Sequence, residues 1–65
     1  MTLLTQREAA SVLRLSERTL ERMRVSGTGP KFVRLNTSIR YRQQDLAAHV
    51  AARVVSSTSE KGVQQ

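Results

Sequence analysis

The chain has 65 residues, of which 11 are lysine or arginine and 5 are aspartate or glutamate, so its formal net charge is +6. A single domain of this length buries only a modest core, and the absence of cysteine excludes disulfide bonds and thiolate metal sites. One histidine cannot form a metal site alone, and no carboxylate pair lies in an evident cleft, which argues against an enzyme. We expect no cofactor, no metal and no small-molecule ligand.

The sequence also lacks the segments that direct a chain to a membrane. It has no apolar run of about 18 residues and no signal-peptide core at its N-terminus. We therefore expect a soluble, cytoplasmic protein with no membrane partner.

The basic charge is concentrated in the middle of the chain. From residue 14 to residue 42, eight basic residues are opposed by two glutamates, and eight minus two accounts for all six net charges. Seven of the eight are arginine, whose planar guanidinium suits bidentate contacts with phosphate and guanine. This favours a nucleic-acid partner; the alternative is a solvated basic surface with no partner. The eight residues are Arg14, Arg18, Arg22, Arg24, Lys31, Arg34, Arg40 and Arg42.

A first helix is predicted from about Gln6 to Leu13. Thr5 and Glu8 have the spacing of a capping box, in which each side chain accepts a hydrogen bond from the other residue's backbone amide. The small residues Ala9 and Ala10 would let a second helix cross close to the backbone, although alanine is also simply a good helix former.

A second helix is predicted from Glu17 to Val25 or Ser26. Ser16 has the side chain of an N-cap, so residues 14 and 15 leave room only for a tight turn after the first helix. The Gly-Thr-Gly-Pro sequence at 27–30 ends the helix, because glycine can adopt the left-handed conformation and proline cannot continue a helix. Two short helices joined so closely cross steeply, which predicts a helix-turn-helix.

The second helix has one apolar side and one basic side. If Leu20 and Met23 are buried, Arg18 and Arg22 turn outward together, because residues four apart share a helix face. We interpret this outward face as the surface offered to a DNA groove.

A short hairpin is predicted after the second helix, with strands at 31–35 and 39–42 and a three-residue turn at 36–38. In this register the apolar residues share one face, and two arginines face each other across the other. Like charges so placed destabilise a ladder unless a phosphate lies beside them. The predicted opposite pairs are Leu35 with Ile39, Val33 with Tyr41, and Arg34 with Arg40.

A third helix is predicted from about Gln43 to Val54, with an apolar stripe expected to pack as core behind the first two helices. His49 lies off this stripe, at the surface or its edge. We divide the chain into a domain at 1–55 and a polar tail at 56–65, expected to be disordered, with an interaction arm as the alternative. The stripe consists of Leu46, Ala47, Val50, Ala51 and Val54.

These features resemble a known family. The ordered combination of capping box, second N-cap, Gly-Pro stop, hairpin and Asp-Leu helix start is similar to the AlpA/excisionase branch of the MerR-type winged helix-turn-helix proteins. Two positions depart from that pattern: Arg14 stands where the turn often has glycine, and His49 where the last helix usually has tryptophan. The similarity spans 3–54 and is carried by Leu3-Leu4-Thr5, Glu8-Ala9-Ala10, Leu13, Leu15-Ser16, Arg18-Thr19-Leu20, Arg22, Gly29-Pro30, Phe32-Val33-Arg34-Leu35, Arg40-Tyr41-Arg42 and Asp45-Leu46.

The resemblance implies a mostly α fold with a small β-hairpin, in which the second helix enters the major groove and the hairpin is the wing. We expect Arg18 and Arg22 to read base edges. Glu17 and Glu21 either pair locally with Arg18 and Arg24, which we favour, or one of them accepts a hydrogen bond from cytosine. The expected DNA contacts are Ser16, Glu17, Arg18, Thr19, Glu21 and Arg22 on the helix, Arg34, Asn36, Thr37, Ser38 and Arg40 on the wing, and Thr5, Gln6, Arg14, Arg24 and Lys31 at phosphates.

The resemblance further implies an excisionase, a recombination directionality factor. Such a protein binds tandem sites on double-stranded DNA cooperatively, associates head to tail, bends the DNA and directs a tyrosine recombinase toward excision of a bacterial or phage mobile element. The alternatives are a small AlpA-like transcriptional regulator and, as a weaker candidate, a basic protein-interaction module.

Overall fold

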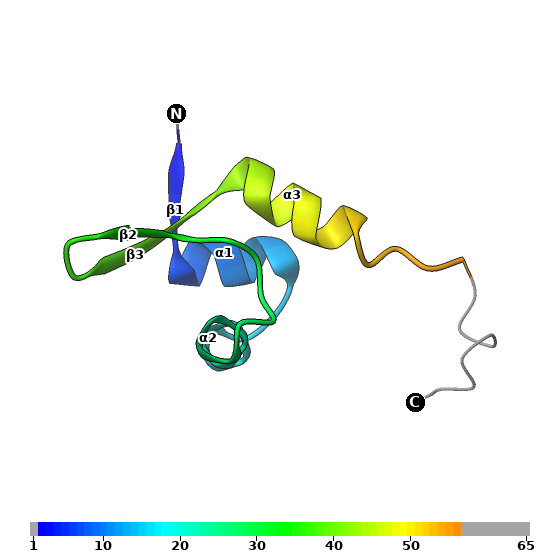
Figure 1. Ribbon diagram of the computed structural model, residues 1–65, viewed down its shortest axis with the longest axis horizontal. Helices are drawn as coiled ribbons and strands as arrows, with labels where there is room; N and C mark the ends of the chain where they lie inside the picture. The colour runs from blue at the N-terminus through cyan, green and yellow to red at the C-terminus, as the bar shows by residue number, and fades with distance from the viewer. Residues whose placement is uncertain (1, 57–65) are drawn as a thin grey trace.

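Three helices and three strands form residues 2–56, the part of the chain that this computed structural model describes (Figure 1). Apart from Ser56, the segment expected to be a disordered tail lies outside the described residues. In chain order the elements are β1 (Leu3–Thr5), α1 (Gln6–Leu13), α2 (Glu17–Ser26), β2 (Val33–Leu35), β3 (Ser38–Arg42) and α3 (Gln43–Ala51).

Helices α1 and α2 are capped at their N-termini as the sequence predicts. The backbone N–H of Thr5 donates to Glu8 Oε1 at 2.9 Å, and the N–H of Glu8 donates to Thr5 Oγ1 at 3.1 Å, which completes the capping box of α1. At α2, the N–H of Thr19 donates to Ser16 Oγ at 3.1 Å. Each cap satisfies amides that the first turn of a helix leaves without partners, so both helices begin where their caps lie.

The C-caps of α1 and α2 both adopt the left-handed backbone conformation. Gly27, with φ of 79°, ends α2 as predicted. Arg14 ends α1 with φ of 61°, although a residue with a Cβ atom adopts this conformation at a cost. This explains why glycine is common at the equivalent position of similar turns.

The sheet has three antiparallel strands in the order β1-β3-β2, one more than predicted. β1 pairs with β3 so that Leu4 lies opposite Tyr41. The sequence predicts no strand before the first helix, because a three-residue strand whose partner lies far along the chain has little local signal. Because α1 follows β1 directly, the pairing of β1 with β3 fixes the start of α1 beside the hairpin.

The predicted hairpin register is wrong by one residue. Leu35 lies opposite Ser38 and Arg34 opposite Ile39, so the turn consists of Asn36 and Thr37 alone. Asn36 adopts φ of 61°, a conformation that asparagine tolerates better than most residues, and this makes the shorter turn accessible. Arg34 and Arg40 consequently lie on opposite faces of the sheet and do not form the predicted pair.

The core is small and contains residues of all three helices and of β3. Within it, the burial of Ala9 and Ala10 favours the first of their two interpretations, close packing of α1 against α2. Tyr41 contributes the largest buried side chain from the sheet. The buried residues, each at most 2% exposed, are Ala9, Ala10, Leu20, Tyr41 and Leu46, and Leu4, Leu13 and Ile39 pack around them.

Helix α3 is shorter and more exposed than predicted. It ends at Ala51, and of its apolar stripe only Leu46 is buried, whereas Val50 is 48% and Val54 74% exposed. The expectation that the whole stripe is core is therefore wrong: periodicity shows which side of a helix is apolar, but so short a chain has no further described element to cover it. His49 lies at the edge and is half-buried, and burial, with the nearby Arg53, lowers its pKa and keeps it neutral at pH 7.

These elements confirm the predicted winged helix-turn-helix. In Figure 1, α2 is seen end-on below α1, and the β2–β3 hairpin projects to one side as the wing. The outer side of α2 is thus free of other described elements.

Candidate nucleic-acid interface

The outward face of α2 is held in place by what its inner face buries. Leu20 is fully buried and Met23 is half-buried, while Arg18 and Arg22 are exposed. The helix therefore presents both arginines outward, as its spacing predicts. Around them the surface forms a shallow hollow lined by Gln6, Glu17, Arg18, Glu21, Arg22 and Val25.

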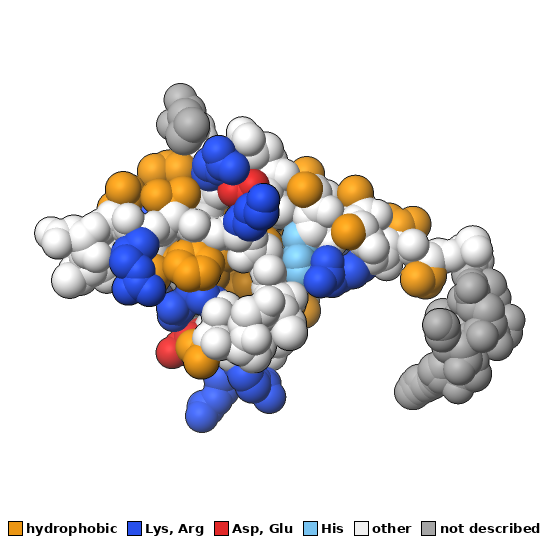
Figure 2. Space-filling model, viewed as in Figure 1, with side chains coloured by type: hydrophobic (Ala, Val, Ile, Leu, Met, Phe, Trp, Pro, Cys, Tyr) orange, Lys and Arg blue, Asp and Glu red, His pale blue; other side chains and the backbone are white. Residues whose placement is uncertain are grey.

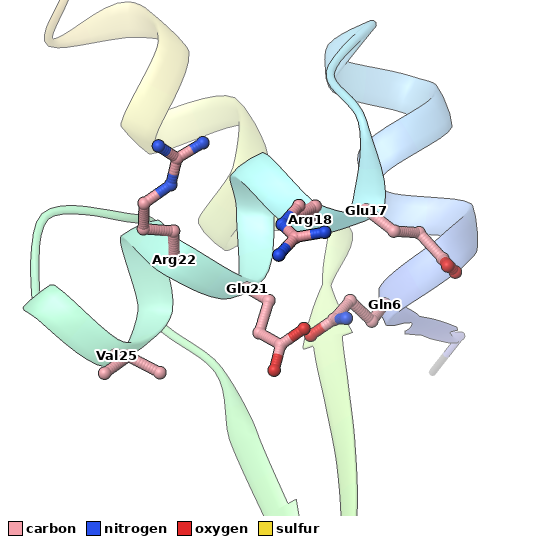
Figure 3. A pocket seen from close by; sticks show the side chains of 6 residues that line it. All are labelled: Gln6, Glu17, Arg18, Glu21, Arg22 and Val25. Carbon is pink, nitrogen blue, oxygen red and sulfur yellow. The ribbon is translucent and has the colours of Figure 1, made fainter.

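Figure 3 shows how these side chains share the hollow. Gln6, from the first turn of α1, points toward Glu21, and in this view Arg22 and Glu21 extend in opposite directions from α2. Gln6 and the α2 residues were expected to contact DNA together, and the structure places them on one surface. One hollow therefore contains neutral, acidic and basic side chains that can hydrogen-bond with a ligand.

The local ion pairs expected for Glu17 and Glu21 are not formed. Within residues 2–56 the ion pair present is a different one, in which Arg42 Nε lies 2.6 Å from Asp45 Oδ2. Both glutamates are exposed. Their carboxylates are consequently available to donors on DNA, such as the amino group of cytosine.

The hydroxyl groups near the helix starts are partly committed. Ser16 Oγ donates to Thr19 Oγ1 at 2.8 Å, and Thr5 Oγ1 accepts from the Glu8 amide. Because a hydroxyl both donates and accepts, the protons of Thr5 and Thr19 remain free for an acceptor such as a phosphate oxygen. Arg14 lies exposed in the turn between the helices.

Arg24 differs from the other arginines of α2. It points back toward the hairpin, where its guanidinium lies over the Phe32 ring, 5.8 Å from the ring centroid. Its Nε atom is buried and has no hydrogen-bond partner. With Lys31 it lines a second hollow, between α2 and the loop that follows it.

The wing presents its cations unequally. Arg34 is exposed, as are Asn36 and Thr37 at the tip, whereas Ser38 is half-buried. Arg40 is half-buried and donates from Nη1 to the Ile39 carbonyl at 2.8 Å. The wing residues therefore lie together at the hairpin, but Arg34 is the freer of its two arginines.

Arg42, at the base of the wing, is neutralised by Asp45. Its Nε and Nη2 atoms donate to the two carboxylate oxygens at 2.6 and 2.9 Å, and these hydrogen bonds lower the pKa of Asp45. Arg42 was expected to add to the binding charge, and the three-residue spacing to Asp45 is the sequence signal that indicates this pair. Of the eight central basic residues, seven remain without a carboxylate partner among residues 2–56.

Basic side chains lie over several parts of the face seen in Figure 2. Figure 2 shows basic side chains at the end where α2 lies and others beside the hairpin, with apolar side chains between them. Among residues 2–56 no group of histidine, cysteine and acidic side chains could hold a metal ion, and no helix is long and apolar enough to cross a membrane.

The comparison with known proteins agrees with this geometry. The model of the helix-turn-helix domain family matches residues 3–54, which include every helix and strand described above. No match was found among curated proteins. The match spans most of the chain, and the protein belongs to the helix-turn-helix domain family, whose domain indicates DNA binding.

Proposed function

We propose that this protein is a sequence-specific DNA-binding excisionase, which binds tandem sites, bends the DNA and directs a tyrosine recombinase toward excision. The observation that carries the DNA-binding part is the outward face of α2, where Arg18 and Arg22 are exposed beside unpaired glutamates. A major groove about 12 Å wide admits such a helix.

In this proposal α2 reads the bases. Arg18 and Arg22 donate to guanine, and a good bidentate contact is worth about 1–3 kcal/mol of discrimination. With the expected local ion pairs absent among the described residues, Glu17 or Glu21 accepts a hydrogen bond from cytosine. Ser16 and Thr19 lie at the start of α2, where the helix dipole and the free hydroxyl proton of Thr19 favour a phosphate.

The other proposed contacts position the protein along the DNA backbone. Phosphates are contacted by Thr5 and Gln6 at the start of α1, by Arg14 in the turn, and by Arg24 and Lys31 beside the loop. The wing reaches the adjacent backbone or minor groove through Arg34, Arg40 and the tip residues. The tip residues are Asn36, Thr37 and Ser38.

The excisionase role is supported by the family to which the chain belongs, which includes small excisionase-like DNA-binding proteins. Bending a short site costs about 1–6 kcal/mol. Head-to-tail contacts between copies on successive sites would offset that cost. The protein catalyses no reaction in this role; it selects the direction in which the recombinase acts.

The test is reconstitution on DNA that flanks the protein's own gene. We expect footprints over successive repeats, slower gel migration of bent DNA, and more excision product when the recombinase is added. Binding to one site, without bending and without an effect on recombination, would contradict the excisionase role. A promoter reporter that responds equally with the recombinase gene intact or deleted would instead support a transcriptional regulator.

Salt dependence separates DNA binding from a protein-interaction role. Each phosphate neutralised on duplex DNA lowers log K by about 0.9 per tenfold rise in salt concentration. We expect a steep fall, as several cations contact phosphates. A flat response would favour a protein partner that uses the same helices.

A further inference from the structure

Arg24 is enclosed by groups from two different elements. It belongs to α2, but its guanidinium lies over Phe32 and near Tyr41, both of which belong to the hairpin region. The two aromatic rings also contact each other, with centroids 6.3 Å apart and planes tilted by 53°. The cluster Phe32–Arg24–Tyr41 thus lies where α2 contacts the start of the hairpin.

Two polar atoms of this cluster are buried without partners. Tyr41 is 0% exposed, and neither its hydroxyl nor Arg24 Nε makes a hydrogen bond. Burial raises the pKa of Tyr41, and the guanidinium of Arg24 lowers it by a smaller amount. The two side chains are therefore close enough to interact, although no hydrogen bond of ordinary geometry joins them. Buried polar groups left in this state destabilise a fold, so their retention needs an explanation.

The loop after α2 brings a second cation to the same place. A Cβ atom on Gly29 would lie 3.1 Å from Met23 Cβ, so this glycine allows the loop to pack tightly against α2. The close packing places Lys31 beside Arg24 in a hollow whose lining, among the described residues, includes no carboxylate. An anion entering the hollow would meet two cations and an aromatic wall.

The position of this hollow matches one part of a DNA duplex. A helix in the major groove and a wing at the adjacent minor groove must straddle the sugar-phosphate backbone that separates the two grooves. A cation held between helix and wing therefore faces that backbone. Arg24 spans this boundary, since it starts on α2 and ends against the hairpin residues.

We propose that Phe32 and Tyr41 are positioning residues that aim Arg24 at the phosphate lying between the two grooves, with Lys31 as the second cation. This assignment rests on the proposed DNA-binding function and adds two residues that neither base reading nor the wing tip uses. Phe32 limits the guanidinium to the plane above its ring. When the phosphate binds, the Tyr41 hydroxyl accepts a hydrogen bond from the guanidinium, which turns its other N–H groups toward the phosphate oxygens.

The experiment measures binding of the full chain to a random-sequence duplex, because a phosphate contact does not depend on base sequence. The variants are Tyr41→Phe, Arg24→Ala and their double variant. The control is Arg7→Ala, which removes an exposed arginine of α1 and is made alone and combined with Tyr41→Phe. Affinity is measured by fluorescence anisotropy at several salt concentrations, and the thermal midpoint of each variant is recorded.

Arg24→Ala is expected to reduce the salt slope by about 0.9, the loss of one phosphate contact. Tyr41→Phe is expected to weaken binding about 2- to 10-fold, the range for one hydrogen bond, and to have no effect in the Arg24→Ala background. Its thermal midpoint should stay equal or rise, because it removes a buried hydroxyl without a partner. Arg7→Ala should leave the effect of Tyr41→Phe intact.

A merely structural role for Tyr41 gives a different result. Equal loss of affinity in both backgrounds, or a lower midpoint that accompanies the loss, would overturn the positioning role while the steep salt response of the parent chain still supports DNA binding. A flat salt response of the parent chain would overturn DNA binding itself, and this assignment with it.

Discussion

Arg18 and Arg22 on α2 differ from Arg40 and Arg42 on β3 in what holds them. Arg18 and Arg22 are exposed and make no hydrogen bond or ion pair with another of residues 2–56. By contrast, Arg40 donates to a carbonyl and Arg42 to the Asp45 carboxylate. These arginines contribute equally to the net charge, but they fall into two groups. Arg18 and Arg22 are free of such partners, whereas Arg40 and Arg42 are tethered by hydrogen bonds within the protein. Free guanidinium groups can adjust to base edges, whereas tethered ones keep a fixed position.

The free group depends first on the burial of Leu20. Leu20→Ala is expected to lower the free energy of unfolding by about 2–5 kcal/mol, the usual cost of this truncation in a core. A domain of this length has only about 3–10 kcal/mol in total. We therefore expect substantial unfolding in a chemical denaturation experiment, together with loss of DNA binding.

The control for that variant is Val25→Ala, on the same helix. Val25 is 75% exposed, so its truncation should change the free energy of unfolding by no more than about 0.5 kcal/mol. Equal losses of stability in the two variants would contradict an orientation of α2 that buries Leu20 and exposes Val25.

The second prediction contrasts a free arginine of α2 with the exposed arginine of the wing. Arg22→Ala should reduce discrimination between the footprinted site and random DNA by about 1–3 kcal/mol, because a base contact is lost. Arg34→Ala should weaken both complexes alike and lower the salt slope by about 1. Titrations of both duplexes measure the two effects. Equal weakening of both duplexes by Arg22→Ala would move Arg22 to the phosphate contacts.

The parts of the fold that the sequence predicts are those decided by near neighbours. The caps at Thr5 and Ser16 and the stop at Gly27 each depend on residues within a few positions of one another. The outward placement of Arg18 and Arg22 follows from the same helical periodicity, so this part of the candidate site was also predictable.

The errors concern features decided across the chain. β1 exists because β3 lies beside it, and the hairpin register depends on a left-handed Asn36 that the composition of the turn does not require. The Arg24 cluster likewise needs Phe32 and Tyr41 from the hairpin. Pairing, turn length and tertiary contact of this kind have no signal within a single helix or strand.

The third prediction releases a tethered arginine. Asp45→Asn should free Arg42, raise the net charge by one and strengthen binding to random DNA, with a steeper salt slope. The hydrogen bonds from Arg42 lower the pKa of Asp45 in the folded state, so the pair stabilises the fold above the unfolded pKa of this carboxyl, about 4. This stability is lost as the pH falls through the lower, folded pKa.

Thermal midpoints of the parent chain and Asp45→Asn test this linkage. We expect a small loss of stability in the variant at pH 7 and convergence of the two midpoints as the pH falls below the folded pKa of Asp45, where the carboxyl is protonated in both folded and unfolded chains. Unchanged DNA affinity in Asp45→Asn would show that Arg42 does not reach the duplex even when it is free.

The smallest expected effect concerns Arg14, which combines an exposed cation with a left-handed backbone. Arg14→Gly removes a strain of about 1–2 kcal/mol from the folded state, because glycine adopts the left-handed conformation freely. The greater freedom of glycine in the unfolded chain lowers the free energy of unfolding by about 0.5–1 kcal/mol, so the net effect is small. The variant should therefore be slightly more stable in denaturant titrations. It should also bind DNA with a salt slope lower by about 0.9, because a phosphate contact is lost. Higher stability with an unchanged slope would leave Arg14 as a turn residue alone and remove it from the binding surface.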